Sequence, residues 1–440
     1  MQACVQCGDD SKLVSSLVTC IDCSKRYHMH CLIPALIELP RGDWHCPRCI
    51  AFLVQSQPQP FTHEFGFAQS QREYSLTEFA AVADKFKSDY FRMKAKEVPL
   101  DVVEKEFWRI MSSMEDAVTV EYGADLQNNE YGSGFAAECG KNLSKNDRTY
   151  LQHPWNLNNL PVAEGSLFKY VNQNISGMIV PWMYVGMCFS TFCWHNEDHW
   201  SYSINYLHWG EAKSWYGVPG DASEQFESAI KRIAPELFHS QPDLLQQLVT
   251  ICNPNPLQQA GVPIYRCHQM PGEFVVTFPR SYHAGYNQGM NFAEAVNFAP
   301  ADWLPIGRSC VSHYASLSRY PVFSHDELIC KMANDPHLDP NIAQAAYLDA
   351  LSMVESEKEL RKDALDWGLV HAEQELYELL PDDERQCEVC KTTCFLSAVT
   401  CMCSPSKSSI HDPCSGDLTL FPNNRQTGLH PGSGQAVQHM

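Results

Sequence analysis

The sequence predicts a mixed, mainly β fold in which helices flank a double-sheet β barrel of the jelly-roll or cupin kind, with a zinc-binding module before it and a helical domain after it. Three observations support this prediction. Residues 119–299 are rich in Tyr, Trp, Phe, Val and Gly, which suits the short strands of such a barrel. Helix-forming sequences with apolar residues at helical spacing lie on both sides. Seven of the 20 cysteines lie between Cys4 and Cys49, mainly in Cys-x-x-Cys pairs, which indicates zinc and not disulfides.

The first module contains four closely spaced pairs of potential zinc ligands. A closed structural zinc site takes four ligands, so eight ligands suffice for two sites. The spacing resembles a PHD finger, and Trp44 matches the tryptophan usual in that family. In PHD fingers alternate pairs share a metal. The resemblance therefore implies a domain over residues 1–50 with one site from Cys4, Cys7, His28 and Cys31 and a second from Cys20, Cys23, Cys46 and Cys49.

PHD fingers typically bind the N-terminal tail of histone H3, and this resemblance makes that tail an expected partner. Fingers that prefer unmodified lysine use acidic side chains near the second zinc pair, where this chain has Ser24, Lys25 and Arg26. Two interpretations therefore stand side by side: the finger binds the tail, or it is purely structural.

Residues 51–75 are predicted to be a linker, with a Gln/Pro-rich stretch at 55–60. Amphipathic helices are predicted after it, over 76–90 and 102–114. Pro99 and Asp101 are typical of a helix start. These helices begin the predicted catalytic region, 76–323.

The candidate metal ligands begin with His195 and Glu197. They close the aromatic run 187–194, which predicts a strand, and in a strand residues i and i+2 share a face and can reach one ion. Three more His-x-acid pairs lie in a polar region that favours helices, where i and i+2 do not face one another, and we expect these residues at the surface. They are His325/Glu327, His337/Asp339 and His371/Glu373.

His283 is the predicted third ligand, because it follows the buried strand predicted over 274–278 and its Pro-containing turn. Two imidazoles and one carboxylate form a facial iron(II) site, which leaves three positions open for a chelating cosubstrate and dioxygen. Lys213, in a third aromatic strand candidate over 209–219, strengthens the hypothesis, since a buried lysine needs a negative partner. The distal carboxylate of 2-oxoglutarate would provide one.

Long stretches of the chain resemble the JumonjiC domain of the JARID-type histone demethylases. The resemblance extends from Cys4 to about Lys407. The matching stretches are EKEFWR (104–109), VTVEYGAD (118–125), FCWH (192–195), DHWSYSINYLHWG (198–210), FAEAVNF (292–298) and LLPDDERQC (379–387).

This resemblance implies an Fe(II)- and 2-oxoglutarate-dependent dioxygenase that demethylates tri- and dimethylated lysine 4 of histone H3 through N-methyl hydroxylation and release of formaldehyde. It also implies a place in the nucleus and in chromatin-associated complexes. The implied roles are iron binding by His195, Glu197 and His283, 2-oxoglutarate binding by Tyr122, Ser203, Asn205 and Lys213 with Phe192 and Trp215 as walls, and a methyl-lysine and peptide groove at Tyr184 and Asn287.

The C-terminal part is predicted to begin with a helical support domain over 324–386. Asp339 and Pro340 are typical of a helix start there, and Ile342 opens the apolar positions that follow. Residues 387–414 resemble the opening half of the family's C-terminal zinc finger, and residues 415–440, poor in aliphatic side chains, are predicted to be disordered. One zinc ion is expected from Cys387, Cys390, Cys394, Cys401 and Cys403.

Charge and hydropathy exclude several classes of function. The formal charge of −20, from 32 basic and 52 acidic residues, opposes binding to nucleic acid phosphates, and no direct DNA binding is expected. Residues 177–194 are uncharged, but Pro181 and Gly186 interrupt them, so no membrane helix is predicted. The chain starts without a secretory signal, in keeping with a soluble protein.

Two alternatives to the demethylase remain at this stage. The family usually carries JumonjiN and ARID segments before the PHD finger, and this sequence begins at the finger, which favours a catalytically weak chromatin reader or scaffold as one alternative. The other is a protein hydroxylase of the same oxygenase class.

Overall fold

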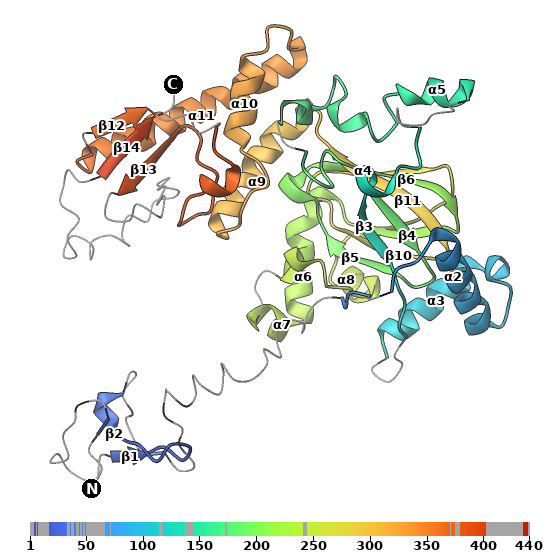
Figure 1. Cartoon of the computed structure of the whole chain (residues 1–440), viewed down its shortest axis with the longest axis horizontal. Coiled ribbons are helices and arrows are strands. Elements are labelled where there is room, and N and C mark those ends of the chain that lie inside the picture. The colour runs from blue at the N-terminus through green and yellow to red at the C-terminus, as the bar shows by residue number, and fades with distance from the viewer. Residues whose placement is uncertain are drawn as a thin grey trace. The chain divides into compact units, whose positions relative to one another are not determined.

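The computed structural model divides the chain into two units, Met1–Gln69 and Ser70–Met440. Both are drawn in Figure 1. The structure describes residues 4–5, 7, 17–32, 36, 39–40, 44, 46, 49, 67–70, 72–113, 118–136, 144–171, 174–240, 244–369, 371–374, 379–401 and 434–438.

The first unit is built on a two-stranded antiparallel sheet, β1 (Leu17–Thr19) and β2 (Arg26–His28), followed by the 3-10 helix η2 (Met29–Cys31). Val18 pairs with Tyr27, and both are buried. The Tyr27 ring meets Trp44 edge-on, with centroids 5.7 Å apart. Several other members of this small core are cysteines, so metal ions bound by them would supply much of its folding free energy.

Two antiparallel sheets form the barrel of the second unit, and the predicted double-sheet fold is confirmed (Figure 1). The strand order is β3-β4-β11-β6-β9 in one sheet and β5-β10-β7-β8 in the other. The strands are β3 (Gly123–Gln127), β4 (Trp182–Gly186), β5 (Thr191–His195), β6 (Tyr202–Gly210), β7 (Lys213–Gly217), β8 (Tyr265–Gln269), β9 (Phe274–Thr277), β10 (His283–Asn287) and β11 (Asn291–Phe298).

The register of β10 with its two neighbours determines which side chains meet. His283 pairs with His195 of β5, and Asn287 pairs with Lys213 of β7. Gly285 lies between these two positions, where an added Cβ would come within 2.5 Å of Cζ of Phe192. Glycine is therefore required for the Phe192 ring to lie against β10.

Two N-terminal helices pack on the barrel, as predicted: α2 (Leu76–Phe91), with the short η3 (Ala95–Glu97) after it, and α3 (Leu100–Met111). A capping box between Ser75 and Glu78 begins α2. Phe79 of α2 joins a buried cluster with residues of β4. Phe107 of α3 stacks on Tyr286 of β10, with centroids 4.0 Å apart, so each helix covers one of the sheets.

Short helices fill the connections between the barrel strands. They are α4 (Asn128–Tyr131), α5 (Lys145–Leu151), η4 (Leu160–Val162), η5 (Leu167–Tyr170), η6 (Asp198–Trp200), η7 (Gly220–Ala222), α6 (Ser223–Ile233), α7 (Pro235–Ser240), η8 (Leu244–Gln247) and α8 (Pro254–Gln259).

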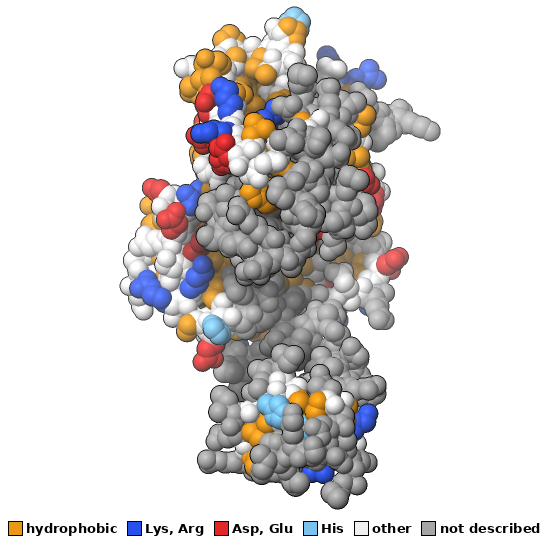
Figure 2. Space-filling view, turned by 90° about the vertical axis from the view of Figure 1, so that its left-hand side faces the viewer, with side chains coloured by type: hydrophobic (Ala, Val, Ile, Leu, Met, Phe, Trp, Pro, Cys, Tyr) orange, Lys and Arg blue, Asp and Glu red, His pale blue; other side chains and the backbone are white. Residues whose placement is uncertain are grey.

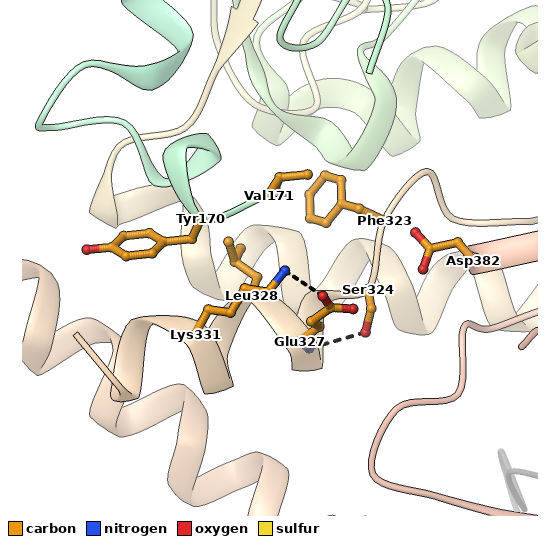
Figure 3. A pocket seen from close by; sticks show the side chains of 8 residues that line it. All are labelled: Tyr170, Val171, Phe323, Ser324, Glu327, Leu328, Lys331 and Asp382. Carbon is orange, nitrogen blue, oxygen red and sulfur yellow. Dashed lines mark hydrogen bonds and ion pairs between the residues drawn. The ribbon is translucent and has the colours of Figure 1, made fainter. Parts of the chain in front are cut away.

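A helical domain follows the barrel, with η9 (Ala301–Trp303), α9 (Leu304–Ser316), α10 (His325–Ala333) and α11 (Pro340–Asp366). The predicted start of α11 is confirmed, because Asp339 caps it and Pro340 is its first residue. These helices share one apolar cluster with residues of the barrel. The buried Trp303 of η9 belongs to this cluster. A small pocket lies where η5, α10 and Asp382 meet (Figure 3).

The prediction that all three remaining His-x-acid pairs lie at the surface is wrong for one of them. His337 and Asp339 are exposed, but His325 is only 3% and Glu327 only 9% exposed. The imidazole of His325 lies 3.2 Å from Asp349, and Glu327 forms an ion pair with Arg385. Partners distant in sequence compensate the burial of these polar groups, which spacing alone does not reveal.

The last described elements are η11 (Asp382–Glu384) and a three-stranded sheet in the order β12-β14-β13, formed by β12 (His371–Gln374), β13 (Ser397–Cys401) and β14 (Gly434–Gln438). His371 and Glu373 thus lie in a strand, where a helix was expected. Disorder was predicted for 415–440, but 434–438 form β14, because β12 and β13 pair with both of its edges. Residues 415–433 lie outside the described part.

Among the described residues, no helix is long and apolar enough to cross a membrane. On the face shown in Figure 2, described acidic and basic side chains lie in small mixed groups.

Candidate metal centre

The structure brings the three predicted iron ligands together. His195 ends β5 and His283 begins β10, and the two are partners in the strand register. The ligand atoms of these histidines and Glu197 all lie within 4.8 Å of one another. Nε2 of His283 is 3.3 Å from a carboxylate oxygen of Glu197. Two strand ends that are distant in sequence therefore meet at one point, as predicted.

Backbone carbonyls orient both imidazoles. Nδ1 of His195 lies 2.7 Å from the carbonyl oxygen of Cys193, and Nδ1 of His283 lies 3.0 Å from that of Ser281. With the proton on Nδ1 donated to the carbonyl, each Nε2 keeps its lone pair for a metal ion. Such outer hydrogen bonds are the usual way in which proteins set the tautomer of a metal-binding histidine.

The electrostatics also suit a divalent cation. Burial, with a smaller contribution from His283, lowers the pKa of His195 to about 4, so its imidazole is neutral at pH 7. Burial opposes the charge of Glu197, but a proton on Nε2 of His283, in the place that a metal ion would take, outweighs it and holds the pKa of this carboxyl at about 2. A carboxylate and imidazole nitrogens at one point fit a ferrous ion.

Asn297 is a functional candidate that the sequence did not reveal as one. Its Nδ2 donates to Oε2 of Glu197 at 2.9 Å and to the hydroxyl of Ser201 at 3.0 Å. It therefore fixes one carboxylate oxygen while the other faces His283. The residue lies in the stretch 292–298 that carries the family resemblance, which was the one available signal.

Lys213 is buried in the barrel, with 2% of its surface exposed. Its Nζ donates to Oδ1 of Asn287 at 2.7 Å and to the hydroxyl of Tyr122 at 3.3 Å, and the rings of Tyr122 and Phe192 lie within 6 Å. Among the described residues no carboxylate pairs with it. Burial lowers its pKa to about 7. The structure therefore contains the predicted lysine on the inward face of a strand, and the charge of this lysine needs a negative partner.

Phe192 and Trp215 lie next to Lys213 and the metal ligands. Their rings meet edge-on with centroids 4.7 Å apart, and the Trp215 ring is 6.0 Å from that of His283. Ser203 and Asn205 lie on β6 of the opposite sheet, where they share a face at positions i and i+2. Ser203 bonds the hydroxyl of Thr277, and Asn205 accepts from Gln269 of β8, across the barrel interior.

The two residues predicted for the substrate groove lie in different surroundings. Tyr184 faces Tyr122, with ring centroids 6.1 Å apart, and its hydroxyl bonds the exposed Asp125. Asn287 is fully buried, and its Nδ2 donates to the hydroxyl of Ser190 at 2.9 Å. The structure thus brings Asn287 to Lys213 and not to an exposed surface.

Both predicted zinc sites of the first unit are brought together with the predicted alternation. The ligand atoms of Cys4, Cys7, His28 and Cys31 converge at one point and those of Cys20, Cys23, Cys46 and Cys49 at another. Backbone amides support the sulfurs: the amide of His28 donates to Sγ of Cys4 at 3.3 Å, and that of Cys46 to Sγ of Cys20 at 3.1 Å.

Of the predicted C-terminal ligands, Cys387, Cys390 and Cys394 are buried in one cluster. Among the side chains that the structure describes, they do not form a third convergent metal site. Cys403 and the side chain of Cys401 lie outside the described part. The third zinc site therefore stays a prediction.

Comparison with known proteins agrees with this geometry. Residues 182–298 match the JmjC domain, hydroxylase; residues 302–355 match the lysine-specific demethylase 5, C-terminal helical domain; and residues 4–49 match the PHD-finger. The predicted family resemblance is confirmed. The barrel with the candidate metal centre resembles a JmjC domain over residues 182–298.

Curated relatives are similar over almost the whole chain. Lysine-specific demethylase 5B of Gallus gallus is 55% identical over 407 residues, which are 92% of this chain and 26% of that protein. Lysine-specific demethylase 5D of Homo sapiens is 55% identical over 419 residues, 94% of this chain and 27% of that protein. The chain thus spans about a quarter of the length of these relatives.

Proposed function

We propose that this chain is an Fe(II)- and 2-oxoglutarate-dependent histone demethylase that acts on tri- and dimethylated lysine 4 of histone H3. The observation that carries the proposal is the convergence of His195, Glu197 and His283 beside a buried lysine whose hydrogen-bond partners, among the described residues, are all neutral. The names of the relatives, lysine-specific demethylases 5B and 5D, support the same reaction class.

In this proposal His195, Glu197 and His283 hold the iron. Each imidazole offers Nε2, because Nδ1 bonds a backbone carbonyl, and Glu197 offers the oxygen that Asn297 does not engage. A ferrous ion held by these three residues would still have positions open for a chelating cosubstrate and dioxygen.

Lys213 receives the distal carboxylate of 2-oxoglutarate, with the hydroxyl of Tyr122 next to it. Its ammonium is desolvated and pairs with no protein carboxylate among the described residues. A charge-assisted hydrogen bond to the cosubstrate would therefore offset the free-energy cost of burying this charge. Phe192 and Trp215 wall the site and exclude water. Ser203 and Asn205 contribute polar groups from the opposite sheet.

The methylated lysine enters past Tyr184 in this proposal. The rings of Tyr184 and Tyr122 and the carboxylate of Asp125 suit a methylated ammonium group, which aromatic faces and negative charge attract. Bound iron and 2-oxoglutarate supply the oxidising chemistry, which hydroxylates an N-methyl carbon and leads to loss of formaldehyde. Asn287 was predicted for this groove, but its burial makes a role in orienting Lys213 the better proposal.

The test is formaldehyde release from an H3 peptide trimethylated at lysine 4. We expect release that requires 2-oxoglutarate and is abolished in His195→Ala. Lys213→Met should lose it as well, through loss of the cosubstrate. A matched control is His337→Ala, because His337 is exposed and belongs to no metal cluster among the described residues. Release that persists in His195→Ala would contradict the proposal.

Two other outcomes would identify the alternatives. A chain that binds a divalent metal and the histone peptide but releases no formaldehyde is a chromatin reader or scaffold. A mass gain of one oxygen atom on an unmethylated protein target identifies a protein hydroxylase. Mass spectrometry of the methylated peptide distinguishes the first two functions, and mass spectrometry of an unmethylated protein target identifies the third.

We further propose that the finger, with its two zinc ions, contacts the H3 tail, and that the chain works in the nucleus within chromatin-associated complexes without binding DNA directly. The two converging ligand sets of the finger and the demethylase names of the relatives support this placement. A third zinc ion is proposed at Cys387, Cys390, Cys394, Cys401 and Cys403.

A further inference from the structure

We propose that the helical domain after the barrel holds the metal-binding Glu197 in position, and that His199 is the positioning residue through which it acts. This inference rests on the proposed metal site. It goes further, because it assigns a role in metal binding to residues that do not touch the metal. The starting point is the loop from Asp198 to Ser201, which directly follows Glu197.

The backbone of this loop is strained. His199 has φ 52° and the next residue, Trp200, has φ 49°, so two consecutive residues with large side chains adopt the left-handed conformation. Such conformations cost about 1 to 3 kcal/mol each and persist only where the surroundings impose them. In this loop the imposing contacts come from the helical domain.

Four hydrogen bonds hold His199 to that domain. The hydroxyl of Tyr314 in α9 accepts from the backbone amide of His199 at 3.0 Å, and the indole of Trp303 donates to its carbonyl oxygen at 2.9 Å. Nε2 of its ring accepts from the amides of Val322 and Phe323 at 2.9 and 3.4 Å. The backbone amide, the backbone carbonyl and the ring of His199 are therefore all held by residues outside the barrel.

Stacking and charge add to this attachment. The Phe323 ring lies parallel to that of His199, with centroids 4.0 Å apart and an interplanar angle of 12°. Phe323 directly precedes Ser324, which caps α10 by accepting from the amide of Glu327, as Figure 3 shows. Arg319 forms an ion pair with Asp198 at 2.9 Å. The loop is thus tied to η9, to α9 and to the segment between α9 and α10.

The connection to the metal ligand is short. The amide of Trp200 donates to the carbonyl oxygen of Glu197 at 3.0 Å, which closes the loop onto the ligand. Ser201, at the end of the loop, shares Asn297 with the Glu197 carboxylate. If the loop relaxed from its left-handed conformation, both the backbone of Glu197 and this shared hydrogen bond would move. The helical domain therefore determines where the carboxylate points.

Metal affinity of the full chain, with its thiolate sites loaded with zinc, tests this proposal. Mn²⁺ is the probe, since carboxylate and imidazole sites bind it and thiolate sites do not favour it, and free Mn²⁺ is measured by electron paramagnetic resonance. Tyr314→Phe removes only the hydroxyl that accepts from the amide of His199 and donates to Oδ1 of Asp198, both in this loop. Tyr170→Phe is the matched control, because it removes a hydroxyl that bonds Asp335 in the same domain and makes no contact with the loop.

His199→Asn and His199→Gln form a second matched pair. Asparagine tolerates the left-handed backbone but cannot place an acceptor where Nε2 lies, whereas glutamine can. We expect Kd for Mn²⁺ to rise about tenfold in Tyr314→Phe and His199→Asn, in the range known for outer-shell changes. We expect it to stay within twofold in Tyr170→Phe, and His199→Gln to recover most of the affinity.

Unchanged Mn²⁺ affinity in Tyr314→Phe and His199→Asn would overturn the inference. An equal loss in Tyr170→Phe would do the same, because it would show general destabilisation. If His199→Asn does not fold, the comparison of Tyr314→Phe with Tyr170→Phe decides. Since metal affinity is measured without turnover, an inactive but metal-binding chain would count against the proposed function and not against this inference.

Discussion

Lys213→Met is predicted to stabilise the chain and at the same time to abolish its binding of 2-oxoglutarate. The Lys213 side chain is 2% exposed, and its described hydrogen-bond partners, Asn287 and Tyr122, are both neutral. Burial lowers its pKa from 10.5 to about 7. Burial therefore disfavours the charged form of Lys213 in the folded chain. A methionine of similar length removes this desolvation cost.

The magnitude follows from the size of the pKa shift. Each pKa unit corresponds to about 1.4 kcal/mol, so the cost of holding the ammonium in the barrel is roughly 4 kcal/mol at pH 7. Because the folded pKa is the lower one, this cost is complete below pH 7 and disappears as the pH rises through the unfolded value of 10.5. Losing the bonds to Asn287 and Tyr122 offsets about 1 kcal/mol each. A net gain of about 2 kcal/mol is expected at pH 7.

Urea unfolding of the two chains at pH 7, 8.5 and 10 measures this gain as a difference in free energy of unfolding. The gain should be largest at pH 7, shrink at pH 8.5 and turn into a loss by pH 10, where the lost hydrogen bonds outweigh the remaining cost of the charge. Lys87→Met is the matched control, since Lys87 is also fully buried but forms an ion pair with Glu211. Removing one partner of a buried pair costs about 3 to 5 kcal/mol, so this variant should be less stable than the wild-type chain.

Two results would refute the reasoning. If Lys213→Met were less stable than the wild-type chain at pH 7, the ammonium would have a compensating partner. If the gap did not change with pH, the difference would come from packing and not from the charge. Isothermal titration with 2-oxoglutarate, at saturating Mn²⁺, checks the second half of the prediction, that the variant loses the cosubstrate.

Three further predictions use the same site and the finger. Because 2-oxoglutarate requires the charged form of Lys213, its Kd should rise about tenfold for each pH unit above 7, which titration calorimetry measures. Asn287→Asp places a carboxylate at the Lys213 ammonium, so the KM for 2-oxoglutarate should rise at least about tenfold while Mn²⁺ affinity stays the same. Chelation of zinc should unfold the finger, seen as a shift in Trp44 fluorescence, and leave the barrel transition in urea unchanged.

The metal triad could be predicted from sequence because strand geometry is periodic. His195 and Glu197 are two residues apart after an aromatic run, and the alternation of side chains along an extended backbone places them on one side. His283 needed a further assumption, that its strand neighbours the first, and the register of β5 with β10 satisfies it. The eight ligands of the finger were predictable from their spacing, and their division into two sites followed from the resemblance to PHD fingers.

Residues that act through partners distant in sequence could not be predicted. Apart from its place in the family-like stretch 292–298, Asn297 has nothing in the sequence that distinguishes it from a surface asparagine, and the pairing of β11 with β6 brings it to Glu197. His199 is another case, because its partners lie more than 100 residues away. The same limitation explains why His325 was expected at the surface: its partner, Asp349, lies one helix further along the chain.

The two buried lysines show why function had to be inferred from partners and not from residue type. Lys87 and Lys213 are both enclosed in the fold, and a stability argument alone would treat them alike. Lys87 has a carboxylate, Glu211, and contributes to the packing of α2 on the barrel. Among the described residues Lys213 bonds only an amide and a phenol, and no carboxylate there compensates its charge. A buried ammonium of this kind, next to three converging metal ligands, is what a site for an anionic cosubstrate requires.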